Sequence, residues 1–162
     1  WELGLRPVEI VLINAALSNF KGVAGLLFPV MAKALAATPF SASIVTATSS
    51  RNTIRNLITG TGSTLDDAGI DLYYRLLGDR GHVDGTLSMM AQWSLDGLLS
   101  RLPQITTPVH LISGLNDRAV PPSVSRDAAA RLPQARLTEL AQLGHLAHEE
   151  NAALIAALIT EQ

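Results

Sequence analysis

The residues best suited to chemistry are one aspartate and one histidine, each placed soon after a predicted strand. Asp117 follows the apolar run Val109–Ser113, and His145 follows a second predicted strand, Ala135–Leu140. Catalytic and ligand-binding groups of open α/β sheets gather at the carboxyl ends of the strands. We therefore expect Asp117 and His145 at the same edge of one sheet.

The spacing of this pair is compatible with a hydrogen bond between its members. The 28 residues that separate Asp117 from His145 leave room for one helix and one strand. On adjacent parallel strands, Asp117 would accept the Nδ1 proton of His145, and the carboxylate would stabilise the protonated imidazole during acyl transfer. Each residue alone has a plainer interpretation: Asp117 as part of a polar turn, His145 as a helix-capping loop residue. The combination favours a catalytic pair.

The elements that must position this pair follow an alternating strand and helix order. A further strand is predicted at Val8–Asn14, and like Val109–Ser113 it lacks the polar–apolar alternation of a half-exposed strand. Ser123–Leu132 is predicted as the crossover helix between the last two strands, and Glu149–Thr160 as a terminal helix. The fold class is therefore α/β, with about three parallel strands and flanking helices.

The middle of the chain has a different pattern, with helical stretches, glycine breaks and no convincing strand. We expect a helical cap over residues 16–103, inserted into a core formed by residues 1–15 and 104–162. Ser63 or Thr64 is predicted to cap one of the cap helices. The predicted cap helices are Val23–Ala37, Thr53–Thr59, Asp66–Leu77 and Val83–Ala91.

The order of strand, helical cap, strand with Asp, helix and strand with Gly-His resembles the second half of the α/β-hydrolase superfamily. In that family the triad runs Ser, Asp or Glu, then His, which implies that Asp117 and His145 are its last two members. The nucleophile pattern G-x-S-x-G does not occur in the sequence. We expect the serine and the oxyanion hole upstream of Trp1, so that the chain is a C-terminal fragment, inactive alone.

A narrower resemblance comes mainly from the cap. Several strings are similar to the magnesium-chelatase accessory proteins of bacteriochlorophyll biosynthesis, which implies a role beside magnesium insertion, with a porphyrin intermediate or chelatase subunits as partners. His82 and Trp93 then become candidate substrate-binding residues of the cap, although Trp93 also suits ordinary packing. The similar strings are Ile13–Leu17, Gly22–Gly25, Leu27–Pro29, Thr59–Asp66, Gly81–Val83, Met89–Trp93 and Gly144–Glu150.

Composition excludes other classes of function. With 48% hydrophobic and 16% charged residues, the chain is predicted to fold, and a net charge of -2 without a basic run argues against nucleic acid as a partner. The absence of cysteine excludes thiolate sites. The most apolar stretch, Val23–Ala37, is too short to span a membrane. We expect no metal ion, because His145–Glu149 does not have the order H-E-x-x-H, and no bound cofactor, because Thr59–Thr64 lacks the lysine of a P-loop. A cytoplasmic location fits the absence of cysteine.

Three functions remain open from the sequence. The intact protein is a serine hydrolase acting on an ester or similar bond, or it is a non-catalytic accessory protein with an idle triad. The third alternative is that the chain alone has no function and is poorly soluble, because a strand cut from a larger sheet leaves an unpaired edge.

Overall fold

The computed structural model describes residues 4–5, 7–18, 34, 46–47 and 50–160. The chain divides into two compact units. The first comprises residues 1–18, 58–64 and 96–162, and the second comprises residues 19–57 and 65–95. The candidate pair Asp117 and His145 belongs to the first unit, and the cap candidates His82 and Trp93 belong to the second.

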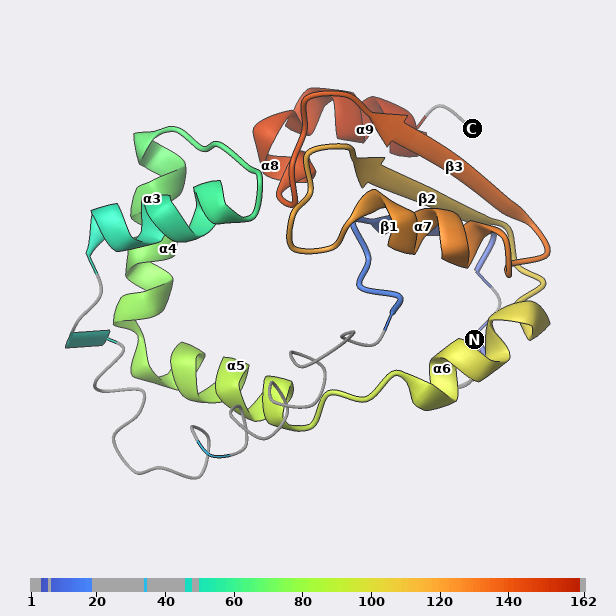
Figure 1. Cartoon of the computed structure of the whole chain (residues 1–162), viewed down its shortest axis with the longest axis horizontal. Coiled ribbons are helices and arrows are strands. Elements are labelled where there is room, and N and C mark those ends of the chain that lie inside the picture. The colour runs from blue at the N-terminus through green and yellow to red at the C-terminus, as the bar shows by residue number, and fades with distance from the viewer. Residues whose placement is uncertain (1–3, 6, 19–33, 35–45, 48–49, 161–162) are drawn as a thin grey trace. The chain divides into compact units, whose positions relative to one another are not determined.

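The first unit is built on a parallel sheet whose strands are β1 (Ile10–Ile13), β2 (Val109–Gly114) and β3 (Ala135–Leu140) (Figure 1). Their spatial order is β1-β2-β3. Every residue of the central strand β2 is buried, which explains the continuous apolar run at these positions. All three predicted strands are confirmed, with β1 shorter than expected.

Helices and alternating side chains place two apolar clusters around this sheet. Because successive residues of a strand point to opposite faces, Leu111 packs in one cluster and Ile112 in the other. The first cluster includes Ala128 of α7 (Pro122–Ala129), and the second includes Ile155 of α9 (Ala152–Thr160). The unit also contains α6 (Asp96–Arg101), the 3-10 turn η1 (Leu102–Gln104) and α8 (Ala147–Glu150).

The second unit contains α4 (Asp67–Gly78) and α5 (Arg80–Ala91), while α3 (Arg51–Gly60) runs from the second unit into the first. The Asp66 side chain caps α4 by accepting a hydrogen bond from the Gly69 N–H. The prediction that Ser63 or Thr64 caps this helix is therefore wrong, because Asp66 occupies the capping position.

Other differences from the expected elements have local causes. The predicted helix Glu149–Thr160 is divided into α8 and α9 because Asn151 adopts a non-helical backbone (φ −147°, ψ 73°). The short helix α6 falls in a stretch for which no helix was predicted. The predicted helix Val23–Ala37 lies, apart from residue 34, outside the described residues.

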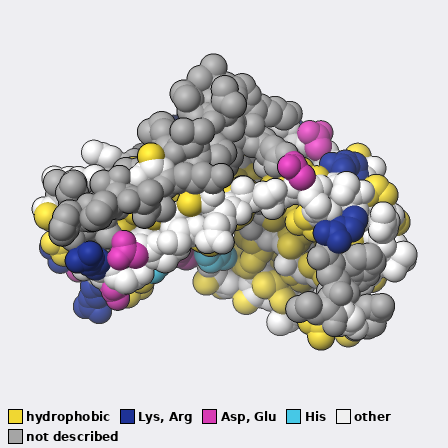
Figure 2. All heavy atoms as spheres, turned by 90° about the horizontal axis from the view of Figure 1, so that it is seen from below, with side chains coloured by type: hydrophobic (Ala, Val, Ile, Leu, Met, Phe, Trp, Pro, Cys, Tyr) yellow, Lys and Arg dark blue, Asp and Glu magenta, His cyan; other side chains and the backbone are white. Residues whose placement is uncertain are grey.

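Basic and acidic side chains lie close together on the described surface. On the face drawn in Figure 2, the described Lys and Arg side chains lie near Asp or Glu side chains. Within the described part of the chain, no helix is both long and apolar enough to cross a membrane.

A second histidine, His110, lies on the central strand β2 and is not part of the candidate pair. His110 is fully buried; its Nε2 lies 2.8 Å from Thr138 Oγ1, and its Nδ1 lies 2.8 Å from Arg136 Nη2. Arginine can only donate, so Nδ1 accepts and Nε2 carries the proton. Burial is the main cause that lowers the pKa of His110, and Arg136 adds to it, while Glu9 acts in the opposite direction.

His110 should make the protein less stable in mild acid. Because its folded pKa lies below the value of about 6.5 expected for the unfolded chain, the unfolded chain binds the proton first. The contribution to the free energy of unfolding is full above about pH 6.5 and is lost as the pH falls through the folded pKa. Urea unfolding of His110→Gln should show a weaker loss between about pH 7 and about pH 5 than the wild type. Equal pH dependence of the two proteins would contradict this role.

Candidate functional site

The loop after β2 buries the carboxylate of Asp117 among backbone donors. The side chain of Asp117 is fully buried, and Oδ1 accepts hydrogen bonds of 2.8 Å from the N–H groups of both Ala119 and Val120. The Asp117 N–H donates to the Gly114 carbonyl at 3.1 Å, which closes the turn after the strand. These contacts hold one carboxylate oxygen and leave Oδ2 available for another partner.

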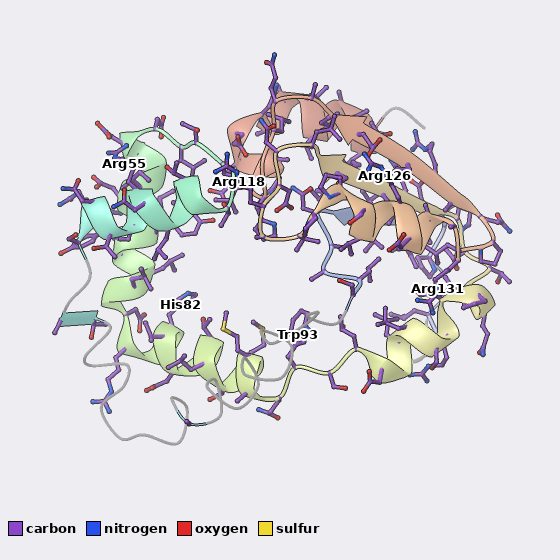
Figure 3. The ribbon with its side chains drawn as sticks, viewed as in Figure 1. Arg55, His82, Trp93, Arg118, Arg126 and Arg131 are labelled. Carbon is purple, nitrogen blue, oxygen red and sulfur yellow. The ribbon has the colours of Figure 1, made fainter. Side chains whose placement is uncertain are left out.

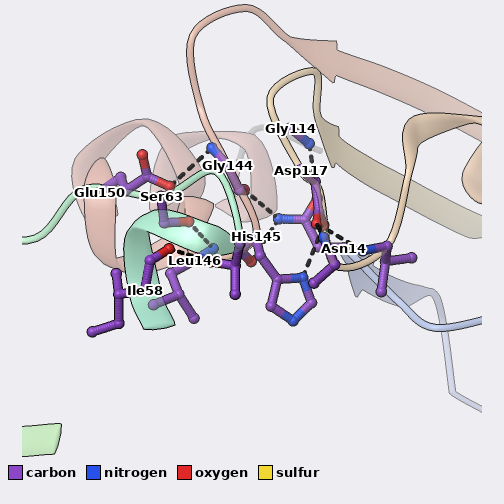
Figure 4. Close-up of polar contacts among 12 residues, drawn as sticks. Asn14, Ile58, Ser63, Gly114, Asp117, Gly144, His145, Leu146 and Glu150 are labelled. Atoms are coloured by element: carbon purple, nitrogen blue, oxygen red, sulfur yellow. Dashed lines mark hydrogen bonds and ion pairs between the residues drawn. The ribbon is translucent and has the colours of Figure 1, made fainter. Parts of the chain in front are cut away.

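That partner is His145, which comes from the loop after β3 (Figure 4). His145 Nδ1 lies 2.8 Å from Asp117 Oδ2, so the structure brings the two predicted residues together. The hydrogen bond to Asp117 is the main cause that raises the pKa of His145, burial opposes it, and the negative charge of Asp117 adds to the rise. Because the carboxylate accepts, the proton of neutral His145 sits on Nδ1 and the lone pair on Nε2.

The second ring nitrogen of His145, Nε2, is the one that is not bound to Asp117. The His145 side chain is 32% exposed, and its Nε2 atom has no hydrogen-bond partner within the described residues. An imidazole with Nδ1 bound to a buried carboxylate can take a proton at Nε2 and later return it, while the carboxylate stabilises the positive charge. The pair therefore has the chemistry of two members of a catalytic triad.

Asn14 joins the loops that carry the pair. Its Oδ1 accepts from the Gly114 N–H at 2.8 Å, and its Nδ2 donates to the carbonyls of Gly144 at 2.9 Å and His145 at 2.8 Å. Asn14 directly follows β1, so its side chain connects the ends of all three strands. In the sequence, Asn14 is the last residue of the predicted strand Val8–Asn14 and part of the string Ile13–Leu17, and no pattern there predicts a role for it in the site.

Residues 61–64 form a third segment at this edge. The buried Ser63 Oγ accepts from the Leu146 N–H at 2.8 Å, and the Thr61 carbonyl accepts from the Arg118 N–H at 2.9 Å. The segment thus contacts both the loop of Asp117 and the loop of His145. The sequence predicted Ser63 as a helix cap and not as a partner of the His145 loop. No local pattern indicates that its hydroxyl binds a residue 83 positions away.

Glu150 supports the His145 loop from the other side. Its Oε1 accepts from the Gly144 N–H at 2.9 Å, and its Oε2 accepts from the Thr64 N–H at 3.4 Å. Glu150 belongs to α8, the short helix that begins two residues after His145. One carboxylate therefore fixes the His145 loop to residues 61–64.

Three glycines allow these backbones to approach each other. A Cβ on Gly62, whose φ is +87°, would lie 1.8 Å from the Asn116 carbonyl oxygen. A Cβ on Gly144 would lie 2.2 Å from the Gly62 carbonyl oxygen, and one on Gly114 would lie 2.5 Å from the Leu143 carbonyl oxygen. No side chain fits at these contacts, so glycine is required.

The other predicted site residues lie in the second unit. His82 is in the first turn of α5, where its N–H donates to Asp79 Oδ1, and Trp93 follows the end of the helix with 40% of its surface exposed (Figure 3). The described residues contain no group of three or more His, Asp or Glu side chains suited to holding a metal ion.

The fold matches that of solved hydrolases. A crystal structure described as an α/β hydrolase fold protein, from Burkholderia ambifaria, superposes with a TM-score of 0.72 at 18% identity, covering 99% of this chain and 59% of that one. The sequence model of the alpha/beta hydrolase fold family matches residues 74–152. The chain has the fold of the α/β hydrolases and spans 59% of that solved structure. The fold predicted from the order of elements is thereby confirmed.

The chain is also similar in sequence to a magnesium-chelatase subunit. It is 50% identical over 154 residues to the magnesium-chelatase 30 kDa subunit of Rhodobacter capsulatus, covering 94% of this chain and 54% of that protein. Rhodomycin D methylesterase of Streptomyces sp. (strain C5) is 42% identical over 62 residues, 36% of this chain and 21% of that enzyme. The chain thus spans about half the length of the former relative. The narrower resemblance predicted from the cap strings is confirmed as homology.

Replacing Gly62 by alanine tests how much the close contact of its backbone with Asn116 contributes to stability. In Gly62→Ala the new methyl group meets the Asn116 carbonyl and the backbone is left-handed, so we expect a loss of about 2–4 kcal/mol in the free energy of unfolding. Gly60→Ala is the matched control, because Gly60 ends α3 with nothing within 4 Å of its Cβ position. Its stability should change by less than about 1 kcal/mol. Equal losses in urea unfolding would contradict the proposed close contact.

Proposed function

We propose that the protein containing this chain is a serine hydrolase that cleaves an ester or a similar bond. The observation that carries this proposal is the 2.8 Å hydrogen bond between His145 Nδ1 and the buried Asp117 carboxylate at the carboxyl edge of a parallel sheet. The chain spans 54% of its magnesium-chelatase relative. The proposal takes the nucleophilic serine and the oxyanion hole from outside the residues of this chain, which contains no G-x-S-x-G.

In the proposed reaction, His145 Nε2 accepts the serine hydroxyl proton as the serine oxygen attacks the ester carbonyl. The imidazolium is stabilised by Asp117, and it then gives the proton to the leaving alcohol when the ester bond breaks. Water, activated in the same way, hydrolyses the acyl-enzyme and restores the serine. Asp117 keeps its negative charge throughout and acts by orientation and electrostatic stabilisation.

The substrate would be selected by the helical cap, residues 16–103. We assign His82 and Trp93 as its candidate binding residues, since an exposed indole and an imidazole suit a flat aromatic ligand. Support for ester chemistry comes from the methylesterase of Streptomyces, although that similarity covers only 36% of this chain. We expect the protein to act in the cytoplasm.

Labelling by a serine-directed fluorophosphonate tests the hydrolase proposal in the intact protein. Labelling of the wild type should rise with pH through the raised pKa of His145, because only neutral His145 can accept a proton. His145→Ala should label far more slowly, and Asp117→Asn should lose on the order of 10⁴ in rate because the wrong tautomer is favoured. His148→Ala, which replaces a second histidine three positions after His145, is the matched control and should label normally. Labelling that is unchanged in His145→Ala would refute the proposal.

A second function is favoured by the 50% identity to the magnesium-chelatase 30 kDa subunit. In this alternative the protein acts beside magnesium insertion in bacteriochlorophyll biosynthesis without cleaving a bond. The cap would bind a porphyrin intermediate or a chelatase subunit, and the Asp117–His145 pair would serve only the structure. The two functions also combine if the substrate of the hydrolase is an ester of a porphyrin.

Titration with protoporphyrin IX tests the accessory alternative. Bound porphyrin should quench the emission of Trp93 and saturate, since porphyrin absorption takes up energy from a nearby indole. Trp93→Phe should reduce the quenching, and Trp1→Phe is the control for the other tryptophan of the chain. An unsaturable, linear decrease that is identical in both variants would count against porphyrin binding by the cap.

A further inference from the structure

Asn14 combines burial, an unusual backbone and a complete set of side-chain partners. It is 5% exposed and has φ 45°, in the left-handed region that few non-glycine residues adopt. Its own N–H donates to the Ile112 carbonyl at 2.9 Å, which continues the pairing of β1 with β2 by one residue. The left-handed turn at Asn14 then ends the strand and presents the amide to the neighbouring loops.

The carboxamide is the group that these loops require. Its Oδ1 faces the Gly114 N–H, and both hydrogens of Nδ2 are used, by the Gly144 and His145 carbonyls. Turning the amide over would point Oδ1 at two carbonyl oxygens and Nδ2 at an N–H, so the network sets its orientation. Aspartate keeps the shape but provides no donor for the two carbonyls, and serine or threonine provides only one.

The contact on His145 is direct. Nδ2 donates to the carbonyl of His145 itself at 2.8 Å, and Oδ1 accepts from the N–H of Gly114, the last residue of β2, three residues before Asp117. The amide therefore ties the backbone that carries the imidazole to the backbone that carries the carboxylate. A 2.8 Å hydrogen bond between two side chains on separate loops persists only if both loops are held in register.

We propose that Asn14 is a positioning residue for His145, holding its loop so that Nδ1 stays aligned with Asp117. The hydrogen bonds by which Asn14 would hold the His145 loop all lie within this chain. Its consequence for turnover rests on the proposed hydrolase function. Without the amide, the His145 loop has no donor that joins it to the end of β1, and the bond to Asp117 should lengthen and weaken.

The charged groups around the loop define the expected change in the His145 pKa. Asp117 acts on His145 directly, Glu150 of α8 binds the Gly144 N–H, and Arg118 lies on the facing loop, where its Cγ is 3.4 Å from the Cβ position of Gly62. His148 and Glu149 face each other at 3.5 Å on α8. Because the bond to Asp117 is the largest cause of the raised His145 pKa, weakening that bond should lower the pKa toward its ordinary value.

The test uses Asn14→Gly, which removes the amide while glycine accepts the left-handed backbone without strain. Gln142→Gly is the matched control. Gln142 is the other described non-glycine residue with positive φ, at 68°, and it is exposed in the turn before the His145 loop. Asn14→Asp is the second variant, since it preserves volume if the glycine variant proves too unstable to study.

Two readouts are recorded in the intact protein. Proton NMR follows the downfield signal of the His145 Nδ1 proton and the pKa of its imidazole, assigned by its loss in His145→Gln. Steady-state hydrolysis of p-nitrophenyl acetate gives kcat and KM separately. Thermal unfolding is recorded alongside, so that a loss of stability is not mistaken for a loss of alignment.

We expect Asn14→Gly to broaden or abolish the Nδ1 proton signal, to lower the pKa of His145, and to reduce kcat about 10- to 100-fold with KM little changed. Asn14→Asp should lose the Nδ1 signal and kcat similarly, whereas Gln142→Gly should match the wild type in both. A lower unfolding temperature in Asn14→Gly with an intact Nδ1 signal and unchanged pKa would overturn the proposal, since Asn14 would then serve only stability.

The two proposals fail in different ways. If the wild type hydrolyses no ester and takes no phosphonate label, the hydrolase function fails, yet the NMR comparison still decides whether Asn14 aligns His145. If the wild type is active and Asn14→Gly keeps its full kcat together with the Nδ1 signal, the positioning role fails and the hydrolase function stands.

Discussion

Close contact between backbones at the carboxyl edge of the sheet is the constraint on which this site depends. The loops after β2 and β3 and the segment 61–64 approach so closely that side chains are excluded at Gly62, Gly114 and Gly144. Only with this spacing can the carbonyl and N–H groups of one loop be reached by the short side chains of another. The site is therefore assembled by backbone geometry first, and the Asp117–His145 bond is its result.

Three side chains bind backbone groups across these contacts, each with a different set of donors and acceptors. Asn14 supplies two donors and an acceptor, Ser63 supplies an acceptor, and Glu150 supplies two acceptors, so that each loop is bound from more than one direction. Asp117 is itself held by two backbone donors before it meets His145. An imidazole held in this way is oriented in advance, which is the property that a preorganised site requires.

Homology and geometry address different parts of the function. The 50% identity to the magnesium-chelatase subunit extends over 94% of this chain, so it includes most of the second unit as well as the first. The Asp117–His145 bond concerns chemistry that many α/β hydrolases share, and a shared fold does not establish a shared reaction. A hydrolase that acts on a porphyrin ester would satisfy both, because the cap would select the ligand and the sheet edge would supply the base.

The sequence by itself determined the strand order, the α/β class and the pairing of Asp117 with His145, because buried parallel strands leave continuous apolar runs and end in recognisable Gly-containing loops. It also indicated the helices α4, α5 and α7 through local periodicity. The roles of Asn14, Ser63 and Glu150 were decided only by the tertiary structure. Their partners are 131, 83 and 86 residues away, and no local pattern records which distant backbone group a side chain will meet.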